Sequence, residues 1–138
     1  MFETGSPAWV ALYLAGNVGL TAWMRRADFR RDGRAAGVAL LDVACNAGMT
    51  IPALAYWDQA IAQLLGDWPL WLLFVLGLMG LAGFTVHDAK AMLANPRLSL
   101  RQRRGFAALG AAAVLLPSAP EVWWGGSALA HIYASAGS

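Results

Sequence analysis

Long apolar stretches alternate with short polar segments along this chain. Each of four stretches holds about the 20 residues that an α-helix needs to cross the hydrocarbon core of a bilayer. They take up most of the 138 residues, which leaves no room for a second domain. The pattern predicts an all-α, polytopic integral membrane protein with one domain. The four predicted transmembrane helices cover residues 7–24, 34–56, 68–86 and 105–124, and residues 125–138 form an outer tail.

Polar residues at the edges of these stretches predict where some helices begin. Asp32 precedes the second stretch and can accept a hydrogen bond from a free backbone N–H group of its first turn. Ser99 and Gln102 have the spacing of a capping box, so the fourth helix should begin inside its polar loop. Residues 57–67 carry apolar side chains at helical spacing but are too few to cross. They predict a short helix lying in the membrane interface.

Prolines fall within two of the predicted helices. Pro52 lies near the end of the second helix, where it can introduce a kink. Pro117 and Pro120 are expected to interrupt the outer half of the fourth helix, which a bundle tolerates when neighbours satisfy the released carbonyls. Glu121 follows directly and is therefore expected to be an acid at the outer interface.

All ten basic residues fall into two short clusters, and each cluster separates two apolar stretches. Lys and Arg are retained on the cytoplasmic side of membranes. Both polar loops are therefore predicted to be cytoplasmic, which places both termini outside and arranges the helices as two antiparallel hairpins. The clusters are Arg25, Arg26, Arg30, Arg31 and Arg34, and then Lys90, Arg97, Arg101, Arg103 and Arg104.

The composition agrees with a membrane location. Charged residues make up 13% of the chain, compared with about 25% in soluble domains. A lipid bilayer is therefore the expected partner, and the net charge of +2 needs no nucleic acid to explain it, because the basic residues flank the predicted spans. Nine of the ten basic residues are arginine, and Ala and Gly are abundant, which we associate with high-GC bacteria. The predicted location is the bacterial inner membrane.

Polar residues recur every four positions on the first two predicted helices, so each helix carries a polar stripe. In an antiparallel hairpin the two stripes lie at matching depths. Unpaired polar groups are costly in hydrocarbon, so we predict a ladder of hydrogen bonds that sets the register of the hairpin. The ladder pairs Tyr13 with Thr50, Asn17 with Asn46, and Thr21 with Asp42.

Asp42 is the ladder residue that carries the most chemistry. It lies about 10 Å from the start of its helix, too deep for so short a side chain to reach water. It must be protonated, paired or hydrated. One interpretation is a neutral structural acid bonded to Thr21 and Asn17, which the sequence favours because it shows no second acid or internal base. The alternative is a proton or cation site.

Glycines on two of the predicted helices leave flat strips on which another backbone can approach closely, a feature that favours helix association in lipid. These strips predict a homo-oligomer or a subunit of a larger membrane complex. The residues are Gly16 and Gly19, and then Gly77, Gly80 and Gly83.

Signatures of catalysis and of cofactor binding are absent from the sequence. It has no His-Glu-x-x-His, phosphate-binding glycine loop, Gly-x-Ser-x-Gly or Cys-x-x-Cys motif, and Cys45 is its single cysteine. His87 and His131 are predicted on opposite sides of the membrane, where they cannot clamp one haem, although a haem or chlorin on a single histidine stays open. We therefore expect no enzyme, metal or cofactor.

Two classes of function fit these features. The first is a non-enzymatic protein that acts by transmembrane helix packing, as an accessory or assembly subunit of a membrane complex or as a membrane-remodelling component. The second is a small homo-oligomeric channel, a holin-like pore, or a proton- or cation-coupled transporter that uses Asp42. The glycine strips favour the first class.

Overall fold

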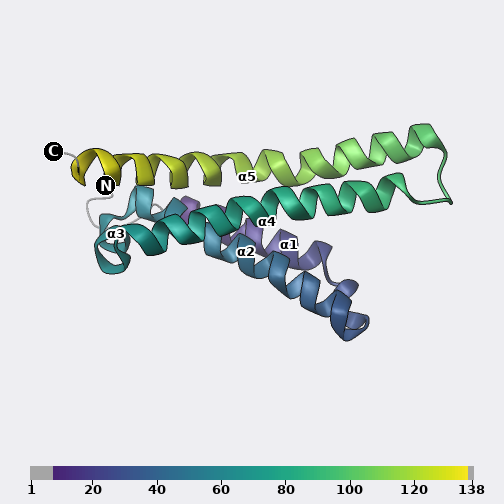
Figure 1. Ribbon diagram of the computed structural model, residues 1–138, viewed down its shortest axis with the longest axis horizontal. Coiled ribbons are helices and arrows are strands. Elements are labelled where there is room, and N and C mark those ends of the chain that lie inside the picture. Colours follow the sequence, from purple (N-terminus) through teal and green to yellow (C-terminus); the bar gives the residue numbers. More distant parts are fainter. Residues whose placement is uncertain (1–7, 137–138) are drawn as a thin grey trace.

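The computed structural model describes residues 8–136, and over this range the chain is all-α, as predicted (Figure 1). The four long apolar helices are α1, α2, α4 and α5, and the short α3 lies between the second and third of them. A single 3-10 turn, η1, connects α1 to α2. The bounds are α1 Ala8–Met24, η1 Asp28–Arg30, α2 Gly33–Trp57, α3 Gln59–Leu65, α4 Asp67–Leu93 and α5 Leu100–Ala136.

The predicted helix starts are confirmed by their hydrogen bonds. The Asp32 side chain accepts from the backbone N–H of Ala35 at 3.0 Å. At the start of α5, the backbone N–H of Ser99 donates to the Gln102 side chain at 3.0 Å, and the backbone N–H of Gln102 donates to the Ser99 hydroxyl at 3.2 Å. These bonds satisfy N–H groups that a helix leaves free at its first turn.

Neither Pro117 nor Pro120 ends α5, which runs for 37 residues through both. Residues 125–136, which were expected to form an outer tail, continue the helix, while residues 137–138 lie outside the described range, as does Pro7. Each proline removes one backbone hydrogen bond, a loss that packed neighbours can offset. At about 1.5 Å per residue, α5 is far longer than the hydrocarbon core is thick.

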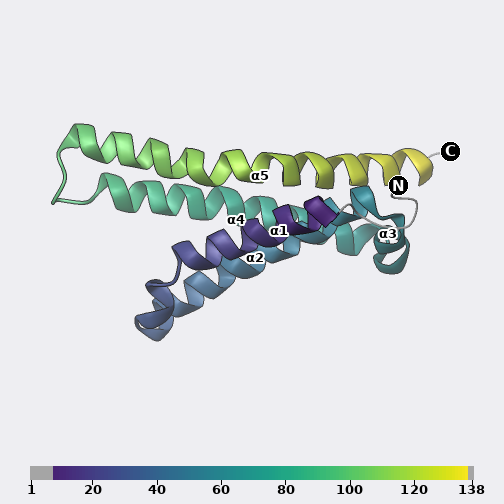
Figure 2. The ribbon, with the colours of Figure 1, turned by 180° about the vertical axis from the view of Figure 1, so that it is seen from behind.

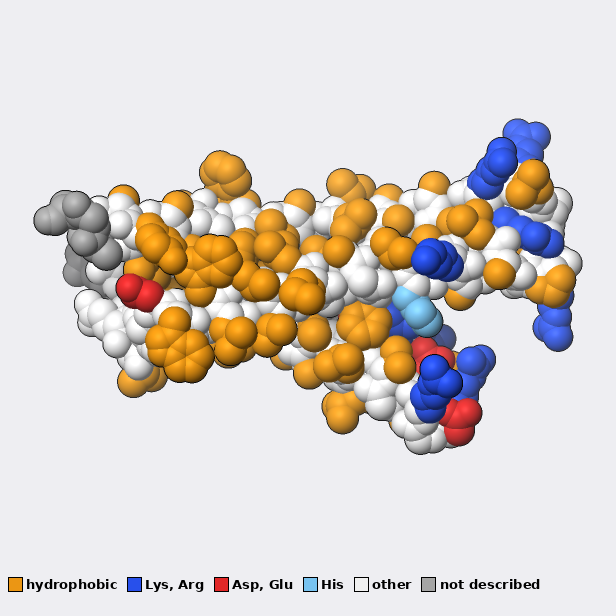
Figure 3. All heavy atoms as spheres, in the orientation of Figure 1, with side chains coloured by type: hydrophobic (Ala, Val, Ile, Leu, Met, Phe, Trp, Pro, Cys, Tyr) orange, Lys and Arg blue, Asp and Glu red, His pale blue; other side chains and the backbone are white. Residues whose placement is uncertain are grey.

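Three helices, α2, α4 and α5, are long and apolar enough to cross a membrane, with mean hydropathies of 1.6, 2.0 and 1.4 over their most apolar windows. The fourth, α1, is apolar but has 17 residues. Large apolar side chains cover the outside of the bundle, among them Leu12, Leu116 and Trp123. Hydrophobic side chains run along the length of the visible face (Figure 3). Such a surface suits contact with lipid.

The helices form two hairpins, α1 with α2 and α4 with α5. Figures 1 and 2 show α3 and the last turns of α5 at one end of the molecule, and the α1–α2 and α4–α5 connections at the other, where the hairpins diverge. We call these the terminal end and the loop end. Lys and Arg side chains gather at the loop end (Figure 3). The two basic clusters thus share one end of the molecule.

Apolar contacts join the hairpins toward the terminal end. Leu70 of α4 is fully buried in a cluster with residues of α2 and α5. A second cluster connects α1 to α2, and Trp57 there contacts Trp9 and Trp124 edge to face, with ring centroids 5.8 and 5.7 Å apart. Aromatic pairs of this geometry stabilise the packing beyond simple burial. The terminal end is therefore the tightly packed part of the bundle.

Candidate functional site

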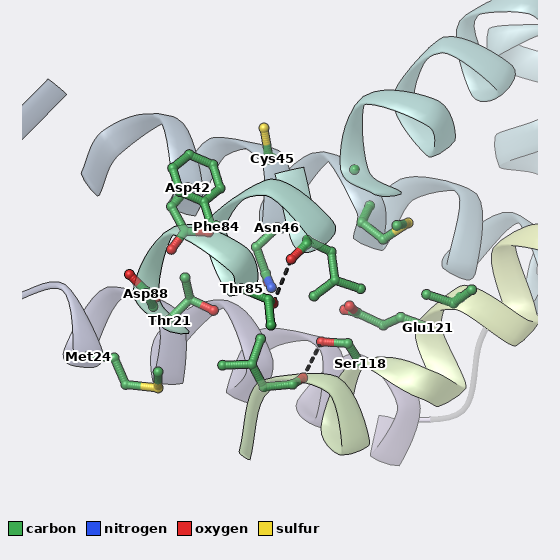
Figure 4. Close-up of a pocket in the computed structure, with 15 residues that line it drawn as sticks. Thr21, Met24, Asp42, Cys45, Asn46, Phe84, Thr85, Asp88, Ser118 and Glu121 are labelled. Atoms are coloured by element: carbon green, nitrogen blue, oxygen red, sulfur yellow. Dashed lines mark hydrogen bonds between the residues drawn. The ribbon is translucent and has the colours of Figure 1, made fainter. Parts of the chain in front are cut away.

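A small polar cavity lies among α1, α2, α4 and α5 (Figure 4). Its volume of about 40 Å³ is enough for a few water molecules. Apolar side chains form part of the wall, but the polar ones come from all four helices. The polar lining residues are Thr21, Asp42, Asn46, Thr85, Asp88, Ser118 and Glu121.

Glu121 is the most deeply buried acid of this group, with 1% of its surface exposed. Its Oε1 atom has no hydrogen-bond partner, while the Asn17 side chain lies within hydrogen-bonding reach of the carboxyl group. One oxygen of the carboxyl group is thus left without a partner among the described residues, and burial of an unpaired polar atom is unfavourable. An arrangement of this kind calls for a function or for an occupant of the cavity.

Asn46 faces the same cavity from α2, and its Oδ1 atom is likewise buried without a partner. Figure 4 shows Asn46 and Glu121 directed toward the space between them. Both orphan atoms are hydrogen-bond acceptors when Glu121 is ionised. They therefore need a donor or a cation in the cavity.

The hydroxyl groups around the cavity do not supply that donor. Thr85 donates to the backbone carbonyl of Leu81 at 2.6 Å, and Ser118 donates to that of Val114 at 2.8 Å. Thr21 donates in the same way to the carbonyl of Asn17 at 3.0 Å. Each hydroxyl proton is thus used within its own helix, which leaves only lone pairs for the cavity. Among the side chains that line the cavity, the Asn46 amide group is then the remaining donor beside several acceptors.

Arg25 lies beyond the lining of this cavity and binds two of the acids that line it. Its Nε atom donates to Asp42 of α2 at 2.7 Å, and its two terminal nitrogens donate to Asp88 of α4 at 3.0 and 2.9 Å. The Arg25 side chain is 11% exposed and its guanidinium lies 5.6 Å from the centre of the Phe84 ring. Burial lowers the pKa of Arg25, but its hydrogen bonds and charge interactions with Asp42 and Asp88 outweigh this and raise it. Arg25 is therefore always a cation.

The predicted pairing of the polar ladder is wrong, although several of its residues meet at the cavity. Tyr13 and Asn17 both donate to the backbone carbonyl of Pro117 in α5, Asn17 at 3.0 Å, rather than to α2. Asp42 binds Arg25 instead of Thr21. The Thr50 hydroxyl donates to the carbonyl of Ala47 in its own helix. The predicted register involved only α1 and α2, whereas α5 also packs against both of them.

Two of the predicted packing glycines are used within the chain. A Cβ atom at Gly80 would lie 2.6 Å from the Cβ atom of Cys45, and one at Gly77 would lie 2.9 Å from that of Met49, so α4 approaches α2 closely here. At Gly16, Gly19 and Gly83 a Cβ atom would meet nothing within 4 Å.

The sequence analysis placed Glu121 wrongly and did not predict a packing role for Gly125. Glu121 was expected at the outer interface because Pro120 was expected to interrupt α5, whereas the helix continues and turns the side chain inward. Ser118 three residues earlier lies on the same helical face, and this polar pair was the available signal. At Gly125 a Cβ atom would lie 2.9 Å from the Phe74 ring, so α5 also packs closely on α4.

The two histidines lie away from the cavity. His87 is exposed and its Nδ1 atom is 3.5 Å from the Asp88 carboxylate, while His131 is on the terminal part of α5. Within residues 8–136 no group of three or more His, Cys, Asp or Glu side chains is placed to hold a metal ion. No protein family, curated protein or solved structure matches the chain.

Proposed function

We propose that this protein is a small, non-enzymatic helical membrane protein that carries protons through an internal site at Glu121. The observation that supports this is the pair of orphan acceptors, Glu121 Oε1 and Asn46 Oδ1, that line one buried polar cavity. Intramembrane carboxyl groups commonly mark proton and ion pathways. The proposal belongs to the transporter and channel class, with Glu121 in place of Asp42 as the central acid.

Protonation of Glu121 supplies a further hydrogen-bond donor to the cavity. A hydronium ion that transfers its proton to the Glu121 carboxylate leaves a neutral water molecule and a carboxylic acid. The acid can then donate its O–H group to Asn46 Oδ1 or to a cavity water molecule. Asp42 is a poorer candidate because Arg25 already balances its charge at 2.7 Å.

The proposed setting is the bacterial inner membrane, with the loop end in the cytoplasm. The gathering of Lys and Arg at one end of the molecule supports this orientation. The cavity then lies between the cytoplasmic loops and the aromatic cluster of the terminal end.

Proton flux in reconstituted vesicles tests the proposal. Under a potassium diffusion potential, the interior of liposomes that contain the wild-type protein should become acidic faster than that of empty vesicles, as reported by an internal pH dye. Glu121→Gln keeps the shape of the side chain but removes its ionisation, so flux should fall at least about tenfold while the helical circular dichroism signal stays unchanged. Asp67→Asn is the matched control, because Asp67 is an exposed acid in the first turn of α4, away from the cavity.

Three results would contradict the proposal. They are wild-type flux no greater than that of empty vesicles, Glu121→Gln flux equal to that of wild type, and movement of sodium without protons. The last would assign the same cavity to a metal cation.

A second candidate is an accessory or assembly subunit, or a membrane-remodelling component, that associates through helix packing. The open positions at Gly16, Gly19 and Gly83 favour it, because no atom of residues 8–136 would lie within 4 Å of a Cβ atom built there, the backbone of the same helix aside. The molar mass in mild detergent decides this candidate. A homo-oligomer or a stoichiometric partner supports it, and a monomer that purifies alone contradicts it.

A further inference from the structure

A second hollow of about 350 Å³ lies at the loop end, on the outer side of Arg25. It is lined by residues from the end of α1, from α4 and from the α4–α5 connection. Met24 and Asp88 line both this hollow and the small acid cavity. Met24 and Asp88 thus form the boundary that the two spaces share, which we call the wall, and Arg25 lines the hollow and binds Asp88 there. We call the outer space the vestibule.

Arg25 holds this wall together by bridging the two hairpins. One edge of its guanidinium group binds Asp42, which lines the acid cavity, and the other binds Asp88, which faces both spaces. A planar guanidinium group that binds carboxylates on two sides is fixed in position as well as in charge. The bond to Asp42 lies within the α1–α2 hairpin, and the bonds to Asp88 cross to the α4–α5 hairpin.

The packing of the bundle makes the loop end the part that can open. The apolar clusters that join the hairpins lie toward the terminal end, and the hairpins diverge toward the loop end (Figures 1 and 2). The Asp88 side chain is 43% exposed, so water competes for its bonds to Arg25. The bond from Arg25 to Asp42 is better shielded, because the Asp42 side chain is 16% exposed. The interaction that crosses between the hairpins is therefore the more exposed to water of the two.

We propose that Arg25 acts as a gate that controls whether protons from the loop end can reach the acid cavity. This inference rests on the proposed function of Glu121 and adds the entry route and its control. While Arg25 binds both acids, the wall is closed. When Arg25 leaves Asp88 and stays on Asp42, the hairpins separate at the loop end, and water from the vestibule connects to Glu121.

The gate is tested by the access of a reagent to the cavity. Ser118 lines the cavity and is 5% exposed, so Ser118→Cys in a Cys45→Ala background places one thiol there. Because the side chain at this position is almost fully buried, we expect a cationic methanethiosulfonate to label the thiol faster when the wall opens. The labelling rate is measured in lipid nanodiscs, where both ends of the protein are accessible.

We expect Arg25→Gln and Asp88→Asn each to raise the labelling rate at least about tenfold over the background protein. Arg26→Gln is the matched control, because the Arg26 guanidinium binds the carbonyl of Trp23 and stacks on its ring instead of joining the hairpins. Its labelling rate should not change. A rate in Asp88→Asn equal to the background overturns the gate, even if Arg25→Gln fails to fold, because Asp88→Asn leaves the Arg25–Asp42 pair in place.

The labelling assay separates the gate from the proposed function, because it measures access and not transport. Faster labelling in both variants together with normal proton flux in Glu121→Gln would leave the gate standing and remove the proton site. Unchanged labelling together with flux lost in Glu121→Gln would remove the gate and keep the site. Labelling that rises equally in Arg26→Gln would also overturn the gate, since a general loosening of the loop end would then explain it.

Discussion

Gly80→Ala is expected to destabilise the bundle, whereas Gly83→Ala on the same helix is not. A Cβ atom at Gly80 would lie 2.6 Å from the Cβ atom and 2.9 Å from the Sγ atom of Cys45. The Cβ atom of Cys45 is attached to the backbone of α2 and cannot rotate away, so the helices themselves must separate. At Gly83 a new Cβ atom would meet nothing within 4 Å.

The size of the effect follows from the difference between the two positions. Carbon atoms in favourable contact lie about 3.5 to 4.0 Å apart, so Gly80→Ala requires a shift on the order of 1 Å between α4 and α2. Overpacking of this kind costs about 1 to 3 kcal/mol. The preference of alanine over glycine in a helix, about 0.5 to 1 kcal/mol, applies to both variants and cancels between them. Gly80→Ala should therefore be less stable than Gly83→Ala by about 1 to 3 kcal/mol.

Unfolding in mild detergent measures this difference. The near-UV circular dichroism of the seven tryptophans reports the packing of the bundle during a titration with a denaturing detergent. Adding Cys45→Gly to Gly80→Ala removes the Cβ atom that is struck and should recover most of the loss. Equal midpoints for Gly80→Ala and Gly83→Ala, or no recovery in the double variant, would refute the close contact between α4 and α2.

Two further predictions concern α1 and the orientation of the chain. Tyr13→Phe removes the hydroxyl that donates to the carbonyl of Pro117, which keeps its bond from Asn17, so the free energy of unfolding should fall by only about 0.5 to 1.5 kcal/mol in the same titration; no change would show that the hydroxyl adds nothing. In a Cys45→Ala background, cysteines at Arg30 and Ser99 should be protected from a membrane-impermeant thiol reagent in intact cells, and one at Gln63 should react. Labelling of position 30 or 99 from outside would reverse or abolish the proposed orientation.

The helices could be predicted from the sequence because the signals that specify a helix are local. Apolar stretches, the Asp32 cap and the Ser99–Gln102 capping box depend on residues within a few positions of one another. Both caps are present, and three of the four predicted spans are helices long and apolar enough to cross a membrane. The short helix between the second and third long helices is also present, as α3. The gathering of basic residues at one end follows from two hairpins of similar direction.

The partners of the polar side chains depended on the packing of helices that are distant in sequence. Asn17 donates to the carbonyl of Pro117, a residue one hundred positions later, and the pairing of Asp42 with Arg25 needs a long side chain that turns back along its hairpin. Neither of these bonds can be predicted from the register of two neighbouring helices. The cavity also needs all four long helices, so no single segment reveals it.

The amino-acid sequence was enough to predict an all-α chain with helices able to cross a membrane, because hydropathy and capping act over a few residues. The burial of Glu121, the cavity that it shares with Asn46, and the bonds of Arg25 to Asp42 and Asp88 became visible only once the helices were packed together. The reason is that burial and pairing depend on which helical faces meet. In an apolar helix such as α5, where prolines do not break the turn, hydropathy alone does not show which face turns inward.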